Sequence, residues 1–412
     1  MAQDDERCGP LVGLRVLDLT RVLAGPFCTM ILGDLGAEII KVEEIEAGDQ
    51  TRNIPPFVEG ESHYFLAINR NKKSVALDAR TPGGRAALLD LVRHCDALVE
   101  NFRPGVMDRL GLGTNVLRGV NPRLIVCSIS GYGQKTSLSA KPSFDLVAQA
   151  LSGVMSINGE PDGPPTKLGL PMGDLGGGLW AAIAILSALQ HRNATGEALT
   201  VDISLLEGML GMLGYLAQDY FVTGNSPQRV GSSHQSVVPY GRFPTADGHM
   251  VLALMVPSFW VKFCAAIGQP ALAQDPRFAT TTGRKENRVE LEALIGRVMA
   301  GRTTSAWQAA FDAADIPASP VNSIAEALAM PIVAERHVVQ LVDHPSAGTV
   351  QAVRSPVRFL DRFEQSAVQP APLLGEHTTE ILQGLLGYTS EQTKALLRDR
   401  AVAARPPDVR TD

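Results

Sequence analysis

The stretch GLRVLDLTRVLAGPFCTMILGDLGAEIIKVEE, residues 13–44, decides the fold class. An apolar strand pattern over 13–20 is followed by a loop, a helix that ends in the Gly33–Gly36 turn, and a second strand over 38–42. A strand–helix–strand unit is the building block of a parallel sheet with a right-handed crossover. A dinucleotide-binding fingerprint needs its glycines after the first strand, and here they follow the helix, so that type of site is disfavoured.

The same order of elements recurs further along the chain. A strand over 74–77, a helix over 81–94 and a strand over 97–100 form a second unit, and a third strand follows at 124–130. The repetition predicts an α/β protein with an open, parallel, Rossmann-like sheet. Ligand-binding loops of such sheets lie at the carboxyl ends of the strands, which is where the loop 101–105 falls.

The later part of the chain changes in composition. With 412 residues, two domains are the default expectation. A single buried helix is expected over 204–223, and a Gly/Ser/Pro-rich loop at 224–239 then precedes a smaller α+β unit with a hairpin through 245–248 and an amphipathic helix over 284–299. We therefore expect a large domain, a small α+β domain and a C-terminal segment at 1–225, 226–330 and 331–412.

Composition excludes several classes of function. A formal net charge of −6 provides no basic footprint for nucleic acid, and the five scattered cysteines have no metal-ligand spacing and suit a reducing compartment. The acidic N-terminus does not resemble a secretory signal, and no uninterrupted apolar run reaches the length of a membrane span. We expect a cytoplasmic protein without a nucleic-acid partner, a membrane partner or a metal.

One acidic residue stands out in the stretch 167–189, KLGLPMGDLGGGLWAAIAILSAL. We expect a loop that ends at Gly173, then Asp174, then an apolar helix over 179–189. Asp174 is open to two interpretations: a cap of the helix N-terminus, or a nucleophile for an activated carbonyl whose oxyanion the free N–H groups stabilise. The glycines at 176–178 favour the second, because each weakens a helix start by roughly 0.5–1 kcal/mol and so indicates a ligand close to the backbone.

Several segments resemble family III CoA-transferases, the group of formyl-CoA transferase and carnitine-CoA transferase. They occur in the family's order and cover nearly the whole chain. The segments are GLRVLDLTRVLAGP (13–26), LGDLGAEIIKVE (32–43), NRNKKSVALD (69–78), VENFRPGVMDRLGLG (99–113), NPRLIVCSISGYG (121–133), GDLGGGLWAA (173–182) and PLLGEHT (372–378).

The resemblance implies a fold and a reaction. The N-terminal part and the C-terminal segment would form the large domain, with the small domain between them, and two subunits would interlock as a homodimer. Asp174 would attack the thioester of an acyl-CoA and give an aspartyl anhydride, which CoA thiolate would convert to an aspartyl-CoA thioester. A free carboxylic acid would then accept CoA by the reverse steps. Coenzyme A is a substrate in this scheme, and no permanently bound cofactor is implied.

The family motifs also imply CoA-binding positions. Three arginines that follow strands suit the phosphates of CoA, and Phe102 suits its adenine, although any one of these arginines could instead be a solvated surface charge. The positions are Leu23, Ala24, Leu77, Asp78, Ala79, Arg80, Asn101, Phe102, Arg103, Arg109, Lys141, Phe144 and Asp145.

Two departures from relatives bear on the substrate. Formyl-CoA:oxalate transferases have Gln and Tyr where this sequence has Leu23 and Phe144, so oxalate is disfavoured. The similar α-methylacyl-CoA racemases have a His in place of Phe144, and a racemase needs that second acid/base group. The open alternatives are a transferase for oxalate or a monocarboxylic acid, a racemase, and a non-catalytic acyl-CoA-binding protein.

The segments NRNKKS and GSSHQSVVPY (231–240) are most similar to the branch that moves CoA between succinate and other dicarboxylic acids. The second carboxylate of such an acid needs cationic or donor-rich partners. The substrate-binding candidates are Arg52, Arg70, Lys72 and His234, with Gly176 and Gly177 beside the nucleophile.

Overall fold

The computed structural model describes residues 8–363 and 368–405, which divide into two compact units. The first unit comprises the described residues of 1–152, 168–213 and 332–412, and the second comprises 153–167 and 214–331. The large domain expected at 1–225 therefore differs in detail, because 153–167 and 214–225 belong to the second unit. The segment after 331 belongs to the first unit, since its strand extends the main sheet.

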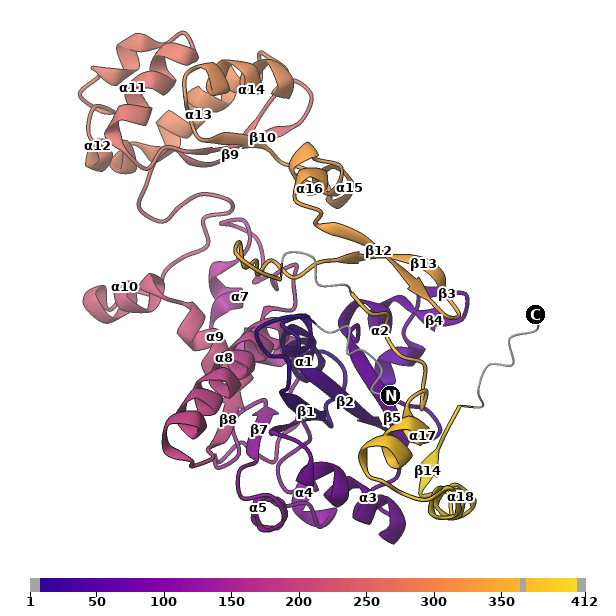
Figure 1. Ribbon diagram of the computed structural model, residues 1–412. Helices are drawn as coiled ribbons and strands as arrows, with labels where there is room; N and C mark the ends of the chain where they lie inside the picture. The colour runs from indigo at the N-terminus through magenta and orange to yellow at the C-terminus, as the bar shows by residue number, and fades with distance from the viewer. Residues whose placement is uncertain (1–7, 364–367, 406–412) are drawn as a thin grey trace. The chain divides into compact units, whose positions relative to one another are not determined.

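A seven-stranded sheet forms the framework of the first unit (Figure 1). The strands follow the order β14-β5-β2-β1-β6-β7-β8; β14 is antiparallel to its neighbour and the other six are parallel. The predicted α/β class with a parallel sheet is thus confirmed. The strands are β1 (Arg15–Asp18), β2 (Glu38–Glu43), β5 (Lys72–Leu77), β6 (Ala97–Glu100), β7 (Ile125–Ser130), β8 (Thr200–Ser204) and β14 (Val402–Ala403).

The strand order reverses direction at β1. Strands β2 and β5 extend the sheet on one side of β1, whereas β6, β7 and β8 extend it on the other. The loops that leave the carboxyl ends of β1 and β6 therefore run apart and leave a crevice between them, which is the usual ligand position in an open parallel sheet.

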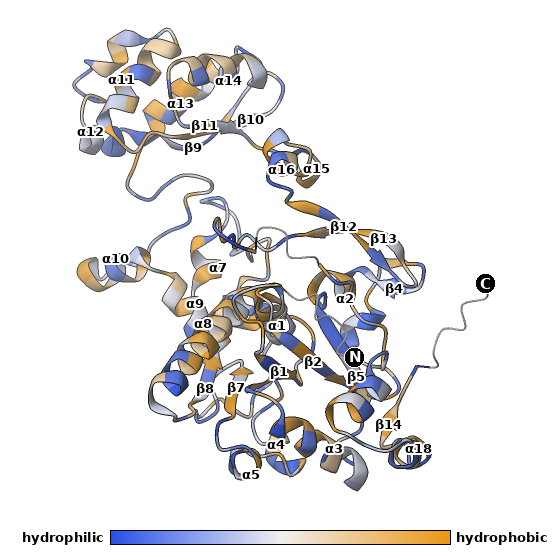
Figure 2. Ribbon diagram, viewed as in Figure 1, coloured by the Kyte–Doolittle hydropathy of each residue, from blue (hydrophilic) through white to orange (hydrophobic). Residues whose placement is uncertain are grey.

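Both faces of the sheet are covered, as expected for buried parallel strands. Side chains alternate between faces along a strand: Ile40 packs in a cluster with Leu88 of α3 (Pro82–Arg93), whereas Ile39 packs close to Gly33 of α1 (Ala24–Asp34). Helix α5 (Thr114–Val120) adds Leu117 to the first cluster, and α8 (Met172–Thr195) packs beside α1 on the other face. Figure 2 shows the hydrophobic colouring of β7 within these layers.

The central helix differs from its prediction. Helix α8 begins at Met172 rather than at 179, so the three glycines lie inside it. A Cβ on Gly178 would lie 2.6 Å from the carbonyl oxygen of Ala24, and one on Gly177 would lie 2.4 Å from the Leu205 side chain. The glycines therefore permit close packing of α8 against α1 and α9 (Leu205–Met212), which corrects the expectation of a ligand against this backbone.

We expect Gly178→Ala to lower the free energy of unfolding by about 1–3 kcal/mol, because the added methyl collides with the backbone of α1. Gly176→Ala is the matched control: its Cβ would meet only the flexible end of Met212, so the gain in helix propensity should keep its effect within about 1 kcal/mol. Urea denaturation at fixed protein concentration measures both. Equal losses in the two variants would contradict the packing explanation.

By length and composition α8 could cross a membrane, and it is the only described helix that could. Half of its most apolar window is buried within the protein, and the core helix of a soluble protein meets the same criteria. Its packing against α1 and the sheet accounts for the buried half of this apolar window.

The single helix expected over 204–223 is two helices. Helix α9 ends at Met212, and α10 (Tyr215–Thr223) starts after Gly214, whose φ of 54° breaks the helical path. None of the residues of α10 is buried, so the expectation of a buried helix is wrong for this half. Apolar composition indicated burial here, but this segment lies outside the core of its unit.

The second unit has its own core. Strands β9 (Tyr240–Pro244), β10 (His249–Ala253) and β11 (Ala318–Pro320) form an antiparallel sheet, which confirms the predicted hairpin. Trp260 and Trp307 lie in a buried cluster between this sheet and its helices. The helix predicted over 284–299 is interrupted at Asn287. The helices are α11 (Pro257–Ala266), α12 (Thr281–Glu286), α13 (Arg288–Met299) and α14 (Thr304–Ala313).

Short elements complete the described chain. A β12–β13 hairpin follows the second unit in the chain, and α18 is the last described helix. These elements are η1 (Gln50–Asn53), β3 (Phe57–Val58), β4 (Glu61–Ser62), α2 (His63–Ile68), α4 (Val106–Arg109), α6 (Asp145–Leu151), α7 (Val154–Ile157), η2 (Pro270–Ala273), α15 (Ile324–Leu328), α16 (Pro331–Glu335), β12 (Val339–His344), β13 (Gly348–Val353), α17 (Thr378–Glu380), η3 (Ile381–Leu385) and α18 (Ser390–Arg398).

Candidate active site

A buried network of charges holds the loop that leaves β1. The Lys41 ammonium donates to the carbonyl oxygen of Thr20 at 2.8 Å and to Asp49 at 2.9 Å. The other oxygen of Asp49 accepts from the backbone N–H of Val22 at 3.2 Å. Val22 has a φ of 67°, a strained conformation for a β-branched residue that persists only where neighbours enforce it. The network therefore fixes the backbone on one side of the crevice.

Lys72 belongs to the same network. Its ammonium makes three hydrogen bonds, to Asp18 at 3.0 Å, to the carbonyl oxygen of Pro26 at 2.9 Å and to Asn69 at 3.0 Å. Burial lowers the pKa of Lys72 to about 8, although Asp18 acts in the opposite sense. Burial alone would raise the pKa of Asp18, but Lys72 and Lys41 hold it well below its usual range. All three hydrogen bonds that the Lys72 ammonium can donate go to groups inside the protein, which leaves none for a substrate and speaks against the predicted substrate role.

Two other predicted substrate ligands are similarly occupied. Arg52 donates to both oxygens of Glu43, each at 2.7 Å, and its guanidinium lies 3.5 Å from the centre of the Phe65 ring. Arg70 binds both oxygens of Asp34, at 3.0 and 2.6 Å. The bidentate pairs neutralise both arginines in buried surroundings. This corrects the prediction that they hold the second carboxylate of a substrate.

A cavity of about 620 Å³ occupies the crevice at the carboxyl edge of the sheet. Segments that follow β1, β2, β5, β6, β7 and β8 all contribute to its wall, which is the arrangement expected at the reversal of strand order. Most of the positions that the sequence predicts for CoA meet here. The predicted residues in the wall are Leu23, Ala24, Leu77, Asp78, Ala79, Arg80, Asn101, Phe102, Arg103, Lys141, Phe144 and Asp174.

Two predicted CoA positions lie elsewhere. Arg109 is exposed at the end of α4 and does not line the cavity, although Val106 and Leu110 of the same turn do. Asp145 starts α6 and hydrogen-bonds to the backbone of α8. Sequence motifs place a residue near a site, but only its side-chain direction decides whether it faces the ligand.

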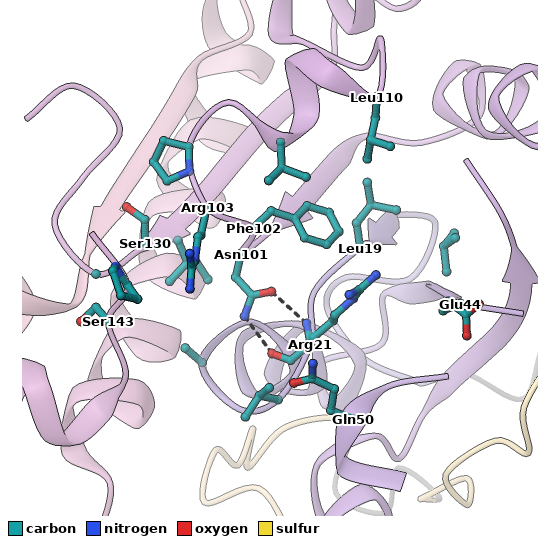
Figure 3. A pocket seen from close by; sticks show the side chains of 18 of the residues that line it. Leu19, Arg21, Glu44, Gln50, Asn101, Phe102, Arg103, Leu110, Ser130 and Ser143 are labelled. Atoms are coloured by element: carbon teal, nitrogen blue, oxygen red, sulfur yellow. Dashed lines mark hydrogen bonds between the residues drawn. The ribbon is translucent and has the colours of Figure 1, made fainter. Parts of the chain in front are cut away.

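Arg21 is a wall residue that the sequence reasoning missed. The Asn101 side chain accepts from the backbone N–H of Arg21 and donates to its carbonyl oxygen, both at 2.8 Å, so it joins the loops after β1 and β6 (Figure 3). The Arg21 guanidinium lies 5.1 Å from the centre of the Phe102 ring, a cation–π contact on the cavity wall. Its place directly after a strand end is the signal that could have identified it.

The cavity wall carries charges of both signs: Arg21, Arg80, Arg103 and Lys141 are basic, and Glu43, Glu44, Asp78 and Asp174 are acidic. Arg21, Arg103 and Lys141 line it, and none of them has a carboxylate partner among the residues that the structure describes. Arg80 differs, because Asp78 in the same turn binds its guanidinium at 2.8 and 2.9 Å. Unpaired cations around a crevice suit an anionic ligand with phosphate groups.

Asp174 is the third residue of α8, half-buried, and lies in the cavity wall. It does not cap the helix: Asp145 does so, with one carboxylate oxygen that accepts from the N–H of Gly173 at 2.7 Å and of Asp174 at 3.3 Å. No described residue donates a hydrogen bond to the Asp174 carboxylate. The carboxylate is therefore available for chemistry, and the helix-cap interpretation of Asp174 is wrong.

The N–H groups at the start of α8 are already used. Met172 donates to the carbonyl oxygen of Leu170 at 2.8 Å, Leu175 donates to that of Pro171 at 3.0 Å, and the two between them donate to Asp145. The expectation that these groups stabilise an oxyanion is therefore wrong. Arg21, Arg103 and Lys141 in the same wall are another source of positive charge for an oxyanion.

The surroundings make the Asp174 carboxylate a stronger base. Burial, followed by the charge of Asp145, raises the pKa of Asp174 to about 7. Tyr64 of α2 lies in the same region: burial, followed by the charge of Asp174, raises the pKa of its phenol. The sequence reasoning missed Tyr64, which stands between two recognised motifs. A buried carboxylate with a pKa near neutrality, in a cavity wall, is typical of a reactive group.

Two further predicted residues, Gly176 and Gly177, do not line this wall. Gly176 and Gly177 are buried in helix contacts. His234 belongs to the second unit, where its Nδ1 accepts from the N–H groups of Ser236 and Val237 at 3.0 and 3.1 Å and its ring stacks on Tyr215. Its role with substrate stays a prediction. Within residues 8–363 and 368–405, no group of three or more His, Cys, Asp or Glu side chains could hold a metal ion.

A carboxylate of raised pKa and three unpaired cations in one cavity wall, at the carboxyl edge of a parallel sheet, are typical of an enzyme that acts on an anionic compound. The sequence profile of CoA-transferase family III matches residues 11–378. The chain belongs to this family and is a CoA-transferase.

Relatives of this chain agree with the assignment. It is 40% identical to succinyl-CoA:glutarate CoA-transferase from Mus musculus, over 96% of this chain and 90% of the relative, and 39% identical to succinyl-CoA:mesaconate CoA-transferase from Haloarcula marismortui, over 91% and 96%. The crystal structure of a CaiB/BaiF family protein from Brucella suis is similar, with a TM-score of 0.82 and 35% identity over 92% of this chain and 100% of that chain.

Proposed function

We propose that this enzyme transfers CoA from succinyl-CoA to a dicarboxylic acid. The observation that carries the proposal is the Asp174 carboxylate, which has no hydrogen-bond partner and shares a cavity wall with three unpaired cations. The names of relatives that match over nearly their whole length support succinyl-CoA as donor and a dicarboxylic acid as acceptor.

The reaction proceeds through Asp174. Its carboxylate attacks the thioester carbon, the C–S bond breaks, and an aspartyl–succinyl anhydride and CoA thiolate form. The thiolate attacks the aspartyl carbonyl, which releases succinate and leaves an aspartyl-CoA thioester. The acceptor carboxylate attacks this thioester, expels CoA thiolate and forms an aspartyl–acceptor anhydride. The thiolate then attacks the acceptor carbonyl of the anhydride, which gives the acceptor-CoA thioester and frees the Asp174 carboxylate. Arg103 and Lys141 balance negative charge as it moves among carboxylate, oxyanion and thiolate.

The cavity also distinguishes the alternatives. Leu23 is buried in the wall and Phe144 is 67% exposed there, so neither supplies the polar group that a small, doubly charged oxalate would favour. No histidine is found among the described residues of the wall, which disfavours a racemase that needs a second acid/base group. A passive acyl-CoA-binding protein would have no need for an unpartnered acid of raised pKa.

An acceptor screen tests the proposal. The enzyme is incubated with succinyl-CoA and, in separate reactions, glutarate, mesaconate, oxalate, acetate and buffer alone, and each new thioester is identified by mass. Glutaryl-CoA or another dicarboxylyl-CoA should form fastest. Faster transfer to oxalate or acetate would replace the dicarboxylate assignment with one of the alternatives. An absence of any new thioester, together with an unmodified Asp174, would refute CoA transfer by this route.

We also propose that the active form is a homodimer with interlocked subunits. One face of α8 exposes Leu179, Trp180 and Ile183, and α6, which packs against α8, exposes Leu146 and Leu151. Several exposed, large apolar side chains on a core helix and its neighbour are typical of a contact with another chain. A second copy accounts for this face in a family whose members form interlocked dimers.

We expect Ile183→Glu to shift the protein from dimer to monomer or to reduce its yield, because the new charge would be buried at the contact. Sedimentation velocity measures the change. Val289→Glu, at a position on the second unit that is more exposed, is the control and should leave the sedimentation coefficient unchanged. A wild-type protein that sediments as a monomer would contradict the proposal.

A further inference from the structure

Asp145 and Gln149 tie one turn of α6 to the segment that carries the nucleophile. Oδ1 of Asp145 accepts from Gly173 and Asp174, and Oδ2 accepts from the Gln149 amide at 2.7 Å. Gln149 is fully buried, and its oxygen accepts from the N–H of Leu168 at 2.8 Å. The two side chains thus hold both the loop that approaches α8 and the first turn of α8 itself.

We propose that Asp145 and Gln149 are a positioning pair that holds Asp174 in place and sets a carboxylate beside it. The proposal rests on the function proposed above and deepens it, because it assigns the control of the nucleophile to residues outside the cavity wall. The hydrogen bonds fix the backbone of Asp174, and the negative charge of Asp145 stands next to the carboxylate that must react.

The charge has a chemical consequence for the reaction. A carboxylate beside another negative charge holds its proton more tightly and is a stronger nucleophile once ionised. A neutral cap such as asparagine would position the helix start equally well, so an ionised cap at this place changes the reactivity of Asp174 as well as its position. This effect on reactivity explains why the cap is Asp145, an acid, although its charge repels the Asp174 carboxylate.

Few other titratable groups lie near the Asp174 carboxylate. The α2 helix contributes Tyr64, and α9 places the apolar Leu205 near Gly177, whereas Arg103 and Lys141 of the cavity wall are not among the groups that shift the pKa of Asp174. Cys28 of α1 and Cys127 of β7 are buried thiols whose pKa burial raises, so they stay neutral. Asp145 is thus the acidic side chain whose charge acts on Asp174 among the described residues.

Three variants test the proposal. Asp145→Asn removes the charge and keeps an acceptor for Gly173. The double variant Asp145→Asn with Gln149→Glu exchanges the two side chains' chemistry. The asparagine at 145 is not charged but can still donate to residue 149, and the glutamate at 149 can still accept from the N–H of Leu168, so the negative charge moves one helical turn along α6. Asp145→Ala removes the cap. Asp202→Asn is the matched control, because Asp202 also braces a loop, through the N–H of Gln134 at 2.9 Å, but not the start of α8.

Two readouts are measured for each variant across pH 4–9: kcat and KM for succinyl-CoA, each determined separately, and carbodiimide labelling of Asp174, located by peptide mass spectrometry. For Asp145→Asn and for the double variant, we expect two shifts of about one pH unit to lower pH. One is in the acid limb of the plot of kcat/KM against pH, and the other is in the pH profile of Asp174 labelling. For Asp145→Ala, we expect kcat to fall about 10–100-fold with little change in KM for succinyl-CoA, because Asp174 loses its position. Asp202→Asn should match wild type in both.

The outcomes separate this inference from the function it rests on. Labelling profiles that coincide in wild type and Asp145→Asn, with unchanged kcat in Asp145→Ala, would overturn the positioning pair while leaving CoA transfer intact. A wild-type enzyme that transfers no CoA but whose Asp174 labelling still shifts in Asp145→Asn would overturn the proposed function and support the pair. Labelling does not depend on turnover, so each result is read independently.

Discussion

Asp174→Asn is expected to reduce the rate of CoA exchange at least about 10⁴-fold, the scale of loss when a covalent nucleophile is removed. Asparagine has nearly the shape of aspartate but cannot form the anhydride or the aspartyl thioester. Succinyl-CoA should still bind, because the cations of the cavity wall are unchanged. The rate is measured by exchange of labelled succinate into succinyl-CoA, and binding by calorimetry. A variant that exchanges at the native rate would refute the role of Asp174.

The same variant has an expected effect on stability that is independent of activity. Burial and Asp145 raise the pKa of Asp174 to about 7, whereas the unfolded chain ionises near 4. Ionisation in the folded state therefore costs stability above about pH 4, and this cost is complete above about pH 7. Asp174→Asn should have a larger free energy of unfolding than wild type at pH 8 and an equal one near pH 4. A less stable variant at pH 8 would contradict this account.

Lys72→Met is expected to lower the free energy of unfolding by about 3–5 kcal/mol, because it leaves the Asp18 carboxylate buried without its partner. The other acceptors of Lys72, on Pro26 and Asn69, would lose their donor as well. Urea denaturation at pH 7, below the pKa of about 8 of this lysine, measures the loss. The loop after β1 should loosen with it, so KM for succinyl-CoA should also rise.

The adjacent residue is the matched control. Lys73 pairs with Glu38 and Glu380 at a site where its side chain is one-third exposed, and Lys73→Met should cost no more than about 1 kcal/mol. Lys72→Met combined with Asp18→Asn should recover part of the loss, because the pair is then removed as a whole. If Lys72→Met and Lys73→Met lower the free energy of unfolding equally, burial of the Asp18–Lys72 pair does not increase its contribution to stability, and the prediction is wrong.

Local patterns in the chain determine much of this architecture. The repeated strand–helix–strand order predicts the parallel sheet, and apolar strands such as β6 are buried as that order requires. Loops after strands predict where the site lies, because the carboxyl ends of parallel strands meet at one edge. The loop 101–105 was placed in this way, and Asn101 and Arg103, which the family motif within it implies as CoA-binding positions, both line the cavity.

The sequence by itself determined the fold class and the edge of the sheet that carries the cavity, and it singled out Asp174 as the proposed reactive acid, because these depend on periodicity and on the order of motifs. Only the tertiary structure decided the partner of each charge. It neutralises Arg52, Arg70 and Lys72 with buried carboxylates, and it brings Asp145 to the start of α8. The physical reason is that pairing, burial and proton affinity depend on distances between segments that are far apart along the chain.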